Sequence, residues 1–160
     1  MHPMHRWLCA LLLLPVLLLP ASASALTITV TEITPAAPAG PNEADVQTLA
    51  RIIYWEARGE PDEGKLAVGQ VVLNRVASDL FPDTIEEVIA QKGQFSPWGC
   101  EGYDAAELPE DCLEAARMVL DGLGELPADV LWFRSDQCVE AWGIANWYTT
   151  IGGHHFYQLR

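Results

Sequence analysis

The stretch YWEARGE, residues 54–60, places a carboxylate where an amphipathic helix gives way to a glycine turn. Apolar residues recur at helical spacing upstream of it and predict a helix that packs one face inward: Val46, Leu49, Ala50, Ile53 and Ala57. Asn42 is predicted to cap the start of this helix, with Asp45 three residues on. Glu56 lies at the edge of the apolar face beside Trp55, where loss of hydration would raise the pKa of the carboxyl group. Such a group suits the general acid of glycoside cleavage.

Residues 1–25 are predicted to be a secretory signal peptide. Arg6 precedes a leucine-rich run at residues 8–19, and the small residues 21–25 offer a cleavage site after Ala25. The run is short for a membrane span, and an uncleaved anchor is the alternative. We therefore expect an exported protein of the periplasm or the cell wall and extracellular space, with no integral membrane span after cleavage.

The chain after the signal is expected to form one compact domain. Residues 26–41 read as a strand-like segment followed by a Pro/Ala spacer, and residues 42–160 as the folded catalytic unit. The formal net charge of the chain is -13, which argues against nucleic acid or anionic lipid as a partner. One core with one site is expected to act as a monomer.

Three cysteines remain after the signal, in a compartment that we expect to be oxidising. A bridge between Cys100 and Cys112 would close a short acidic loop and stabilise the fold by about 3 kcal/mol, and pairing of Cys138 with either of them stays open. A zinc site is the weaker interpretation, because there is no CxxC pair and the only histidines after the signal are His154 and His155. No metal and no organic cofactor are expected.

The order of the predicted elements is helices first and a small sheet last. The remaining helices are expected at residues 61–76, 84–90 and 110–121, and short strands at residues 130–133 and within 144–157. The second helix is apolar over so wide an arc that it should be the central buried one. Thr84 and Glu87 form a capping box for the third, and Gly152-Gly153 is the expected last turn. This order predicts an α+β fold rather than alternating βαβ units.

Several later side chains are candidates for binding a sugar. Gln94-Phe95-Ser96 lies in a loop flanked by glycine and proline, where we expect contact with an N-acetyl or hydroxyl group. Trp132 is the best candidate for stacking on a sugar ring, although aromatic residues more often belong to the core. His154 and His155 point to opposite faces if their segment is a strand, so at most one of them faces a cleft.

Glu60 and Asn74 are predicted to support the site rather than to act in it. Glu60 precedes a proline and is expected to serve as a charge near the start of the next helix. Gly59 is expected to break the first helix, so the carboxylates of Glu60 and Glu56 need not point the same way. Asn74 and Arg75 interrupt an apolar helix, and we expect a buried hydrogen-bond network there that holds the Glu56 loop.

Six blocks of the chain resemble the SleB-type cell-wall hydrolases, a family named for spore-cortex-lytic enzymes. They are LARIIYWEARGE (49–60), EGKLAV (63–68), VVLNRV (71–76), FPDT (81–84), QFS (94–96) and IGGHHFY (151–157), in that family's order. The resemblance covers nearly all of the chain from Asn42 onward. It implies a lysozyme-like fold, mainly helical with a small C-terminal antiparallel sheet, that acts on peptidoglycan as a muramidase or lytic transglycosylase. It also implies that Glu56 is the catalytic acid and that His154 is the histidine near the site.

The leading hypothesis is cleavage between N-acetylmuramic acid and N-acetylglucosamine by lytic transglycosylation. One acid is enough for this reaction, because Glu56 protonates the glycosidic oxygen and then accepts the proton of the muramic acid 6-hydroxyl. Two other hypotheses stay open. One is a zinc amidase that releases the stem peptide with His154, His155 and an acid. The other is a catalytically silent protein that binds the cell wall.

Overall fold

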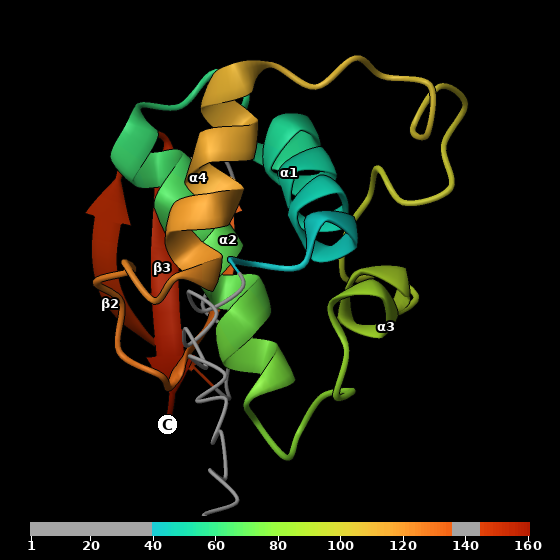
Figure 1. Ribbon diagram of the computed structural model, residues 1–160. Coiled ribbons are helices and arrows are strands. Elements are labelled where there is room, and N and C mark those ends of the chain that lie inside the picture. The colour runs from blue at the N-terminus through green and yellow to red at the C-terminus, as the bar shows by residue number, and fades with distance from the viewer. Residues whose placement is uncertain (1–39, 136–144) are drawn as a thin grey trace, which may run out of the picture. The chain divides into compact units, whose positions relative to one another are not determined.

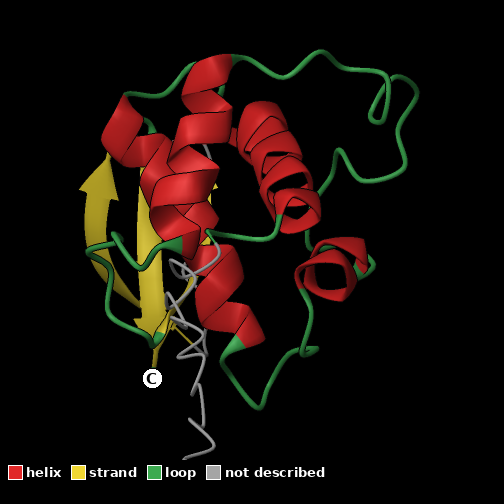
Figure 2. Ribbon diagram, in the orientation of Figure 1, coloured by secondary structure: helices red, strands yellow, loops and turns green. Residues whose placement is uncertain are grey.

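The structure, a computed structural model, describes residues 40–135 and 145–160. The predicted signal peptide, the strand-like segment, nearly all of the spacer, Cys138 and Ile144 lie outside the described residues. The elements are α1 (Glu43–Ala57), α2 (Asp62–Val76), α3 (Ile85–Ala90), α4 (Glu110–Leu120), β1 (Val130–Ser135), β2 (Ala145–Ile151) and β3 (His154–Leu159). The predicted α+β class is confirmed, with the helices before the sheet in sequence and packed beside it in space (Figure 1, Figure 2). Among the described residues, no helix has the length and apolar character that crossing a membrane requires.

Two helix starts form as the sequence predicts. The Asn42 side chain accepts a hydrogen bond from the Ala44 N–H at 3.2 Å and donates one to Asp45 at 3.3 Å, so it caps α1. Thr84 accepts from the Glu87 N–H at 3.2 Å, and its hydroxyl donates to the Glu87 carboxylate at 2.9 Å. The Glu87 carboxylate thus accepts from the hydroxyl of the capping residue, Thr84. The local sequence was sufficient to predict where both helices begin.

Helix α2 is the central buried helix that the sequence predicts. It packs against α1, α4 and the sheet, and most of its side chains are buried. Figure 1 shows α2 between the sheet and the other long helices. The remaining core residues come from every other element and surround it, and the largest fully buried ones are Leu49, Ile52, Ile53, Ile89, Leu131 and Phe156. A helix buried on nearly all sides must satisfy every polar group that it carries.

Two amides of α2 bind the backbone that leads into β1. The Gln70 side chain donates to the Leu126 carbonyl at 2.7 Å and accepts from the Leu126 N–H at 2.7 Å. One turn later, Asn74 donates to the carbonyls of Pro127 at 2.8 Å and Val130 at 3.0 Å. The predicted polar network on this helix therefore exists, but its amides hold residues 126–130 rather than the Glu56 loop.

The sheet has the strand order β1-β3-β2, and both pairs are antiparallel. Strands β2 and β3 form a hairpin whose turn is Gly152-Gly153, as predicted. His154 begins β3, opposite Ser135 of β1 and Ile151 of β2, and its side chain is buried. The next residue, His155, has its Nδ1 at 2.7 Å from the Thr150 hydroxyl. The two histidines thus have different environments, as alternation along a strand requires.

We expect Asn74→Ala to lower the free energy of unfolding by about 2 to 4 kcal/mol, because one buried and one partly buried carbonyl lose their donor. Urea unfolding followed by circular dichroism measures this loss. The matched control is Gln47→Ala on α1. It removes an exposed amide that donates to Glu43, one turn earlier in α1, and should cost less than about 0.5 kcal/mol. Equal losses in the two variants would contradict the assignment.

Candidate active site

Glu56 lies in the last turn of α1 with its side chain half-buried. Burial raises the pKa of its carboxyl group, and the positive charge of Arg75 partly opposes this rise. The carboxyl group therefore holds its proton to higher pH than an exposed glutamate does, and it has a cation within electrostatic reach for the ionised form. These two properties are those that a residue needs in order to donate a proton and later to receive one.

Arg75 reaches this acid from the end of α2, between two aromatic rings. Its guanidinium carbon is 5.0 Å from the ring centroid of Phe81 and 5.1 Å from that of Phe95, and its Nε donates to the Leu131 carbonyl at 2.7 Å. Burial lowers the pKa of Arg75 to about 10, while the negative charge of Glu56 acts in the opposite direction. The guanidinium thus stays charged at neutral pH, and its buried Nη1 has no hydrogen-bond partner.

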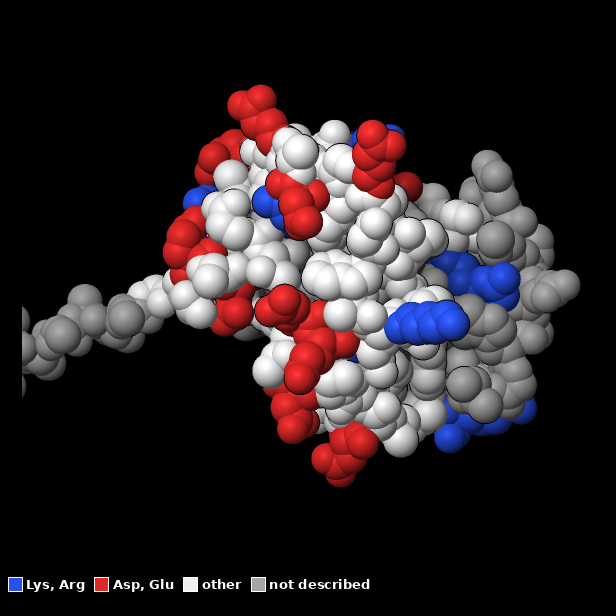
Figure 3. Space-filling view, turned by 90° about the vertical axis from the view of Figure 1, so that its right-hand side faces the viewer, with Lys and Arg blue, Asp and Glu red and all other residues white. Residues whose placement is uncertain are grey.

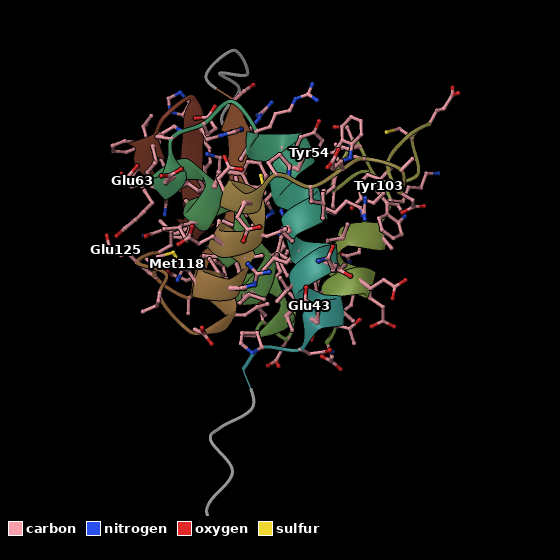
Figure 4. The ribbon with its side chains drawn as sticks, turned by 45° about the horizontal axis from the view of Figure 1, so that its top comes forward. Glu43, Tyr54, Glu63, Tyr103, Met118 and Glu125 are labelled. Carbon is pink, nitrogen blue, oxygen red and sulfur yellow. The ribbon has the colours of Figure 1, made fainter. Side chains whose placement is uncertain are left out.

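A cluster of aromatic rings lies within electrostatic reach of Glu56, around Tyr103. The Tyr103 ring stacks on Trp55 with centroids 6.3 Å apart and contacts Trp98 edge-on at 5.4 Å, while Tyr54 contacts Trp55 edge-on at 5.7 Å. Burial raises the pKa of Tyr103 to about 12, and the negative charge of Glu56 adds to the rise. Figure 4 shows Tyr54 and Tyr103 near the same end of α1. A neutral phenol and an apolar wall therefore lie close to the acid.

Arg51 of α1 holds the loop that carries Tyr103. Its Nη1 donates to the carbonyls of Tyr103, Asp104 and Ala106 at 3.0, 3.1 and 3.3 Å. The sequence reasoning singled out neither Arg51 nor Tyr103. The only local signal for Arg51 is its position next to the apolar face of the first helix. An arginine in such a position usually faces solvent.

Glu60, the second acid of the YWEARGE stretch, binds the hairpin turn of the sheet. Its Oε2 accepts a hydrogen bond from the Gly153 N–H at 2.7 Å, and its Oε1 is 3.8 Å from His154 Nδ1. The carboxylate contacts Gly152 so closely that a Cβ at that position would overlap it. Glu60 therefore joins the α1–α2 connection to the β2–β3 turn. The same carboxylate lies beside His154, the first residue of β3.

His154 lies in a group of aromatic rings that leads back to Arg75. Its ring contacts Phe133 edge-on with centroids 5.2 Å apart, and Phe133 is 6.3 Å from Phe95, on which Arg75 stacks. The structure thus brings Glu56, Arg75, Phe95 and His154 into one contiguous region. These residues come from α1, α2, the loop after α3 and β3.

The other predicted sugar contacts differ in exposure. Gln94 and Ser96 are exposed in the loop after α3. Phe95 is 4% exposed and Trp132 8%, the latter packed against Phe81 at 6.3 Å between centroids. These values argue against the predicted sugar contacts of the two rings and favour packing roles. Trp98, at 38%, offers an exposed ring in this part of the loop instead.

The predicted bridge between Cys100 and Cys112 is not formed, since both are free thiols. Cys112 is buried on α4, where burial raises the pKa of its thiol to about 11, whereas Cys100 lies exposed in the loop. The two side chains therefore occupy different environments. Within residues 40–135 and 145–160, no three His, Cys, Asp or Glu side chains come together in a group that could hold a metal ion.

A half-buried acid at the end of a helix and a small antiparallel sheet are features of a lysozyme-like domain. The chain matches the family described as Cell Wall Hydrolase over residues 59–157, and it belongs to that family. A spore cortex-lytic enzyme of Oceanobacillus iheyensis is 35% identical over 105 residues. That match covers 66% of this chain and 38% of the enzyme, so the chain spans well under half the length of this relative.

Two solved structures share the fold, which confirms the predicted resemblance. The catalytic domain of the Bacillus cereus SleB protein has a TM-score of 0.67 and 29% identity, covering 76% of this chain and 95% of that one. The catalytic domain of a germination-specific lytic transglycosylase, SleB of Bacillus anthracis, has a TM-score of 0.66 and 29% identity, covering 76% and 100%.

We expect Gly152→Ala to cost about 2 to 3 kcal/mol of stability. The backbone at this residue has a φ of +57°, and a new methyl group would meet the Glu60 carboxylate and lie 2.9 Å from the Pro61 ring. Gly99→Ala is the control, because its φ of +74° carries a similar backbone strain but nothing lies within 4 Å of the new methyl group. It should cost about 1 kcal/mol. Chemical denaturation of both variants measures the difference, and equal costs would exclude a close Glu60 contact.

Glu56→Gln should be more stable than the wild-type protein at pH 7. The pKa of Glu56 is higher in the folded protein than in the unfolded chain. The stability that its protonated form contributes is therefore complete below the unfolded pKa and is lost as the pH rises through the folded pKa. Glutamine is neutral throughout, so the gain should vanish below about pH 4.

Urea unfolding of both proteins between pH 3 and pH 8 measures this gain. Glu43→Gln is the control, since it removes an exposed acid from the first turn of the same helix and should lower the stability slightly at pH 7. A Glu56→Gln protein less stable than the wild type at pH 7 would contradict the raised pKa.

Proposed function

We propose that this chain cleaves peptidoglycan glycan strands between N-acetylmuramic acid and N-acetylglucosamine as a lytic transglycosylase. The single observation that carries the proposal is the half-buried Glu56, whose pKa is raised by burial, in a member of the cell wall hydrolase family. The structural relative from Bacillus anthracis is described as a lytic transglycosylase. We propose further that the chain is exported, with residues 1–25 as its signal, and that it works as a monomer on this substrate.

In the proposed reaction, one carboxyl group makes two proton transfers. Glu56 donates its proton to the glycosidic oxygen while the bond from that oxygen to C1 of the muramic acid breaks. The resulting carboxylate then accepts the proton of the 6-hydroxyl of the same sugar, whose oxygen attacks C1 and closes a 1,6-anhydro ring. No water is consumed, and Glu56 ends the cycle protonated, as it began. Burial favours the first transfer, and the charge of Arg75 stabilises the carboxylate between the two.

The environment of Glu60 favours a mechanism with a single acid. Hydrolysis by a retaining or an inverting glycosidase requires a second carboxylate as nucleophile or base. Glu60 is the next acid along the chain, but its carboxylate accepts the Gly153 N–H and lies beside His154. It is therefore engaged in holding the hairpin turn. The zinc amidase alternative would require three metal ligands that converge, and the described part of the chain has no such group.

The exposed loop after α3 is the proposed sugar-binding element beside Glu56. Gln94 and Ser96 offer hydrogen-bonding groups for N-acetyl and hydroxyl substituents, and the exposed ring of Trp98 offers a stacking surface. His154 is proposed to support the site from the sheet side through Phe133. Figure 3 views the side of the domain that carries α3 and the loop after it, and it shows acidic side chains over one part of this side and the larger blue patches at its other end.

Glu56→Gln is expected to lower the rate of fragment release from purified sacculi by roughly 10² to 10⁴-fold, because glutamine cannot donate a proton. Mass spectrometry of the released fragments from the wild type should show 1,6-anhydro-muramic ends. Activity should also fall as the pH rises through the raised pKa of Glu56.

The control for this experiment is Glu43→Gln, on the same helix but at its exposed start, which should keep full activity. Reducing muramic ends would exclude transglycosylation while leaving glycan cleavage in place. Full activity in Glu56→Gln would contradict the assigned acid.

A further inference from the structure

A groove with an apolar floor lies over α2 and α4, on a side of the domain that the proposed reaction does not use. Two hollows form it, with volumes of about 330 and 210 Å³, and both are lined by Leu66 and Met118. Figure 4 shows Met118, Glu63 and Glu125 on one side of the domain and Tyr103, next to the acid, on the other. The groove is therefore separate from the Glu56 region.

The floor of the groove is a continuous apolar surface. It consists of Leu66, Ala67, Ala115, Met118, Leu123, Leu126 and Ile151. Leu123 is 58% exposed, although it follows a helix end where a polar residue would serve equally well. Methionine and leucine side chains on an open groove can adapt their shape to a partner's side chains. An exposed apolar surface of this kind is typical of a site that binds another molecule.

The walls of the groove are acidic. Glu63 and Glu125 line the larger hollow, and Asp62, Asp111 and Glu114 line the smaller one, with no lysine or arginine among the residues of either. The nearest cation along α2 is Lys65, which is 5% exposed, and its Nζ lies 3.0 Å from both Asp62 and Asp111. That lysine holds the first turns of α2 and α4 together. The acids of the larger hollow have no such neighbour in the lining.

We propose that this groove binds a cationic amphipathic segment of a partner protein. Apolar side chains of the segment would pack on Leu66 and Met118, and its lysine or arginine side chains would face Glu63 and Glu125. Charge argues against two other occupants. The chain has no lysine or arginine between residues 7 and 50, so its own N-terminal segment cannot complement the walls, and a second copy with a net charge of -13 would be repelled.

Met118 makes the proposal testable at a single atom. The chain has three methionines, and the other two are Met1 and Met4, so methyl-¹³C labelling of the full chain gives one signal from the groove, assigned with Met118→Leu. The probe is an 18-residue helical peptide of leucine and lysine, compared with the same peptide in which glutamate replaces lysine. The lysine peptide should shift the Met118 signal saturably, and the glutamate peptide should not.

Charge reversal tests whether the walls recognise the peptide. Glu63→Lys combined with Glu125→Lys should weaken binding of the lysine peptide by about tenfold or more. The control, Glu43→Lys combined with Glu86→Lys, changes the net charge equally at exposed acids of α1 and α3 and should weaken it less than about twofold.

Several results would overturn the proposal. They are binding of the glutamate peptide with equal affinity, equal weakening in the two double variants, or an unchanged Met118 signal. A Met118 shift that depends on protein concentration without peptide would assign the groove to a second copy. A shift on deletion of residues 26–41 would assign it to the chain itself. None of these readouts depends on glycan cleavage.

Discussion

The row of polar side chains on α2, buried or partly buried, makes the interaction on which the rest of the domain depends. Gln70 binds the backbone before β1, Asn74 binds the backbone before β1 and at its first residue, and Arg75 binds the Leu131 carbonyl within it. A buried central helix cannot leave amides or a guanidinium without partners, so this row fixes where the sheet lies. The hydrogen bond from Arg75 to the Leu131 carbonyl also holds the guanidinium near Glu56. The Arg75 contact that joins α2 to the sheet therefore also places a positive charge near the Glu56 carboxyl group.

Features set by neighbouring residues were predictable from the sequence. The apolar spacing of α1, the Asn42 and Thr84 caps and the Gly152-Gly153 turn depend on residues at most a few positions apart, and all three formed as expected. The wide apolar arc of α2 predicted its central place for the same reason. Glu56 was recognisable because its aromatic neighbour and the edge of the apolar face both lie within one helical turn of it.

Contacts between distant segments were not predictable in this way. Arg51 binds the loop at Tyr103 across more than fifty residues, and Glu60 binds Gly153 across more than ninety. No local pattern encodes such a pairing. The aromatic side chains illustrate the same limit, since Trp132 is buried in a cluster whose partners include Phe81 from another segment of the chain. A sequence shows that a ring is present, whereas its accessibility depends on the partner that folding brings to it.

The proposed reaction sets two opposing requirements for the position of Glu56. Deeper burial would raise the pKa of the carboxyl group further and favour proton donation, but it would hinder the return transfer, which needs a carboxylate. Arg75 opposes the effect of burial, and its own burial between Phe81 and Phe95 keeps its charge unscreened by water. The buried Nη1 of this guanidinium has no hydrogen-bond partner. It can therefore interact with the Glu56 carboxylate without first breaking another hydrogen bond. The acid and its counter-charge thus have the properties that the proposed reaction requires of a single carboxyl group.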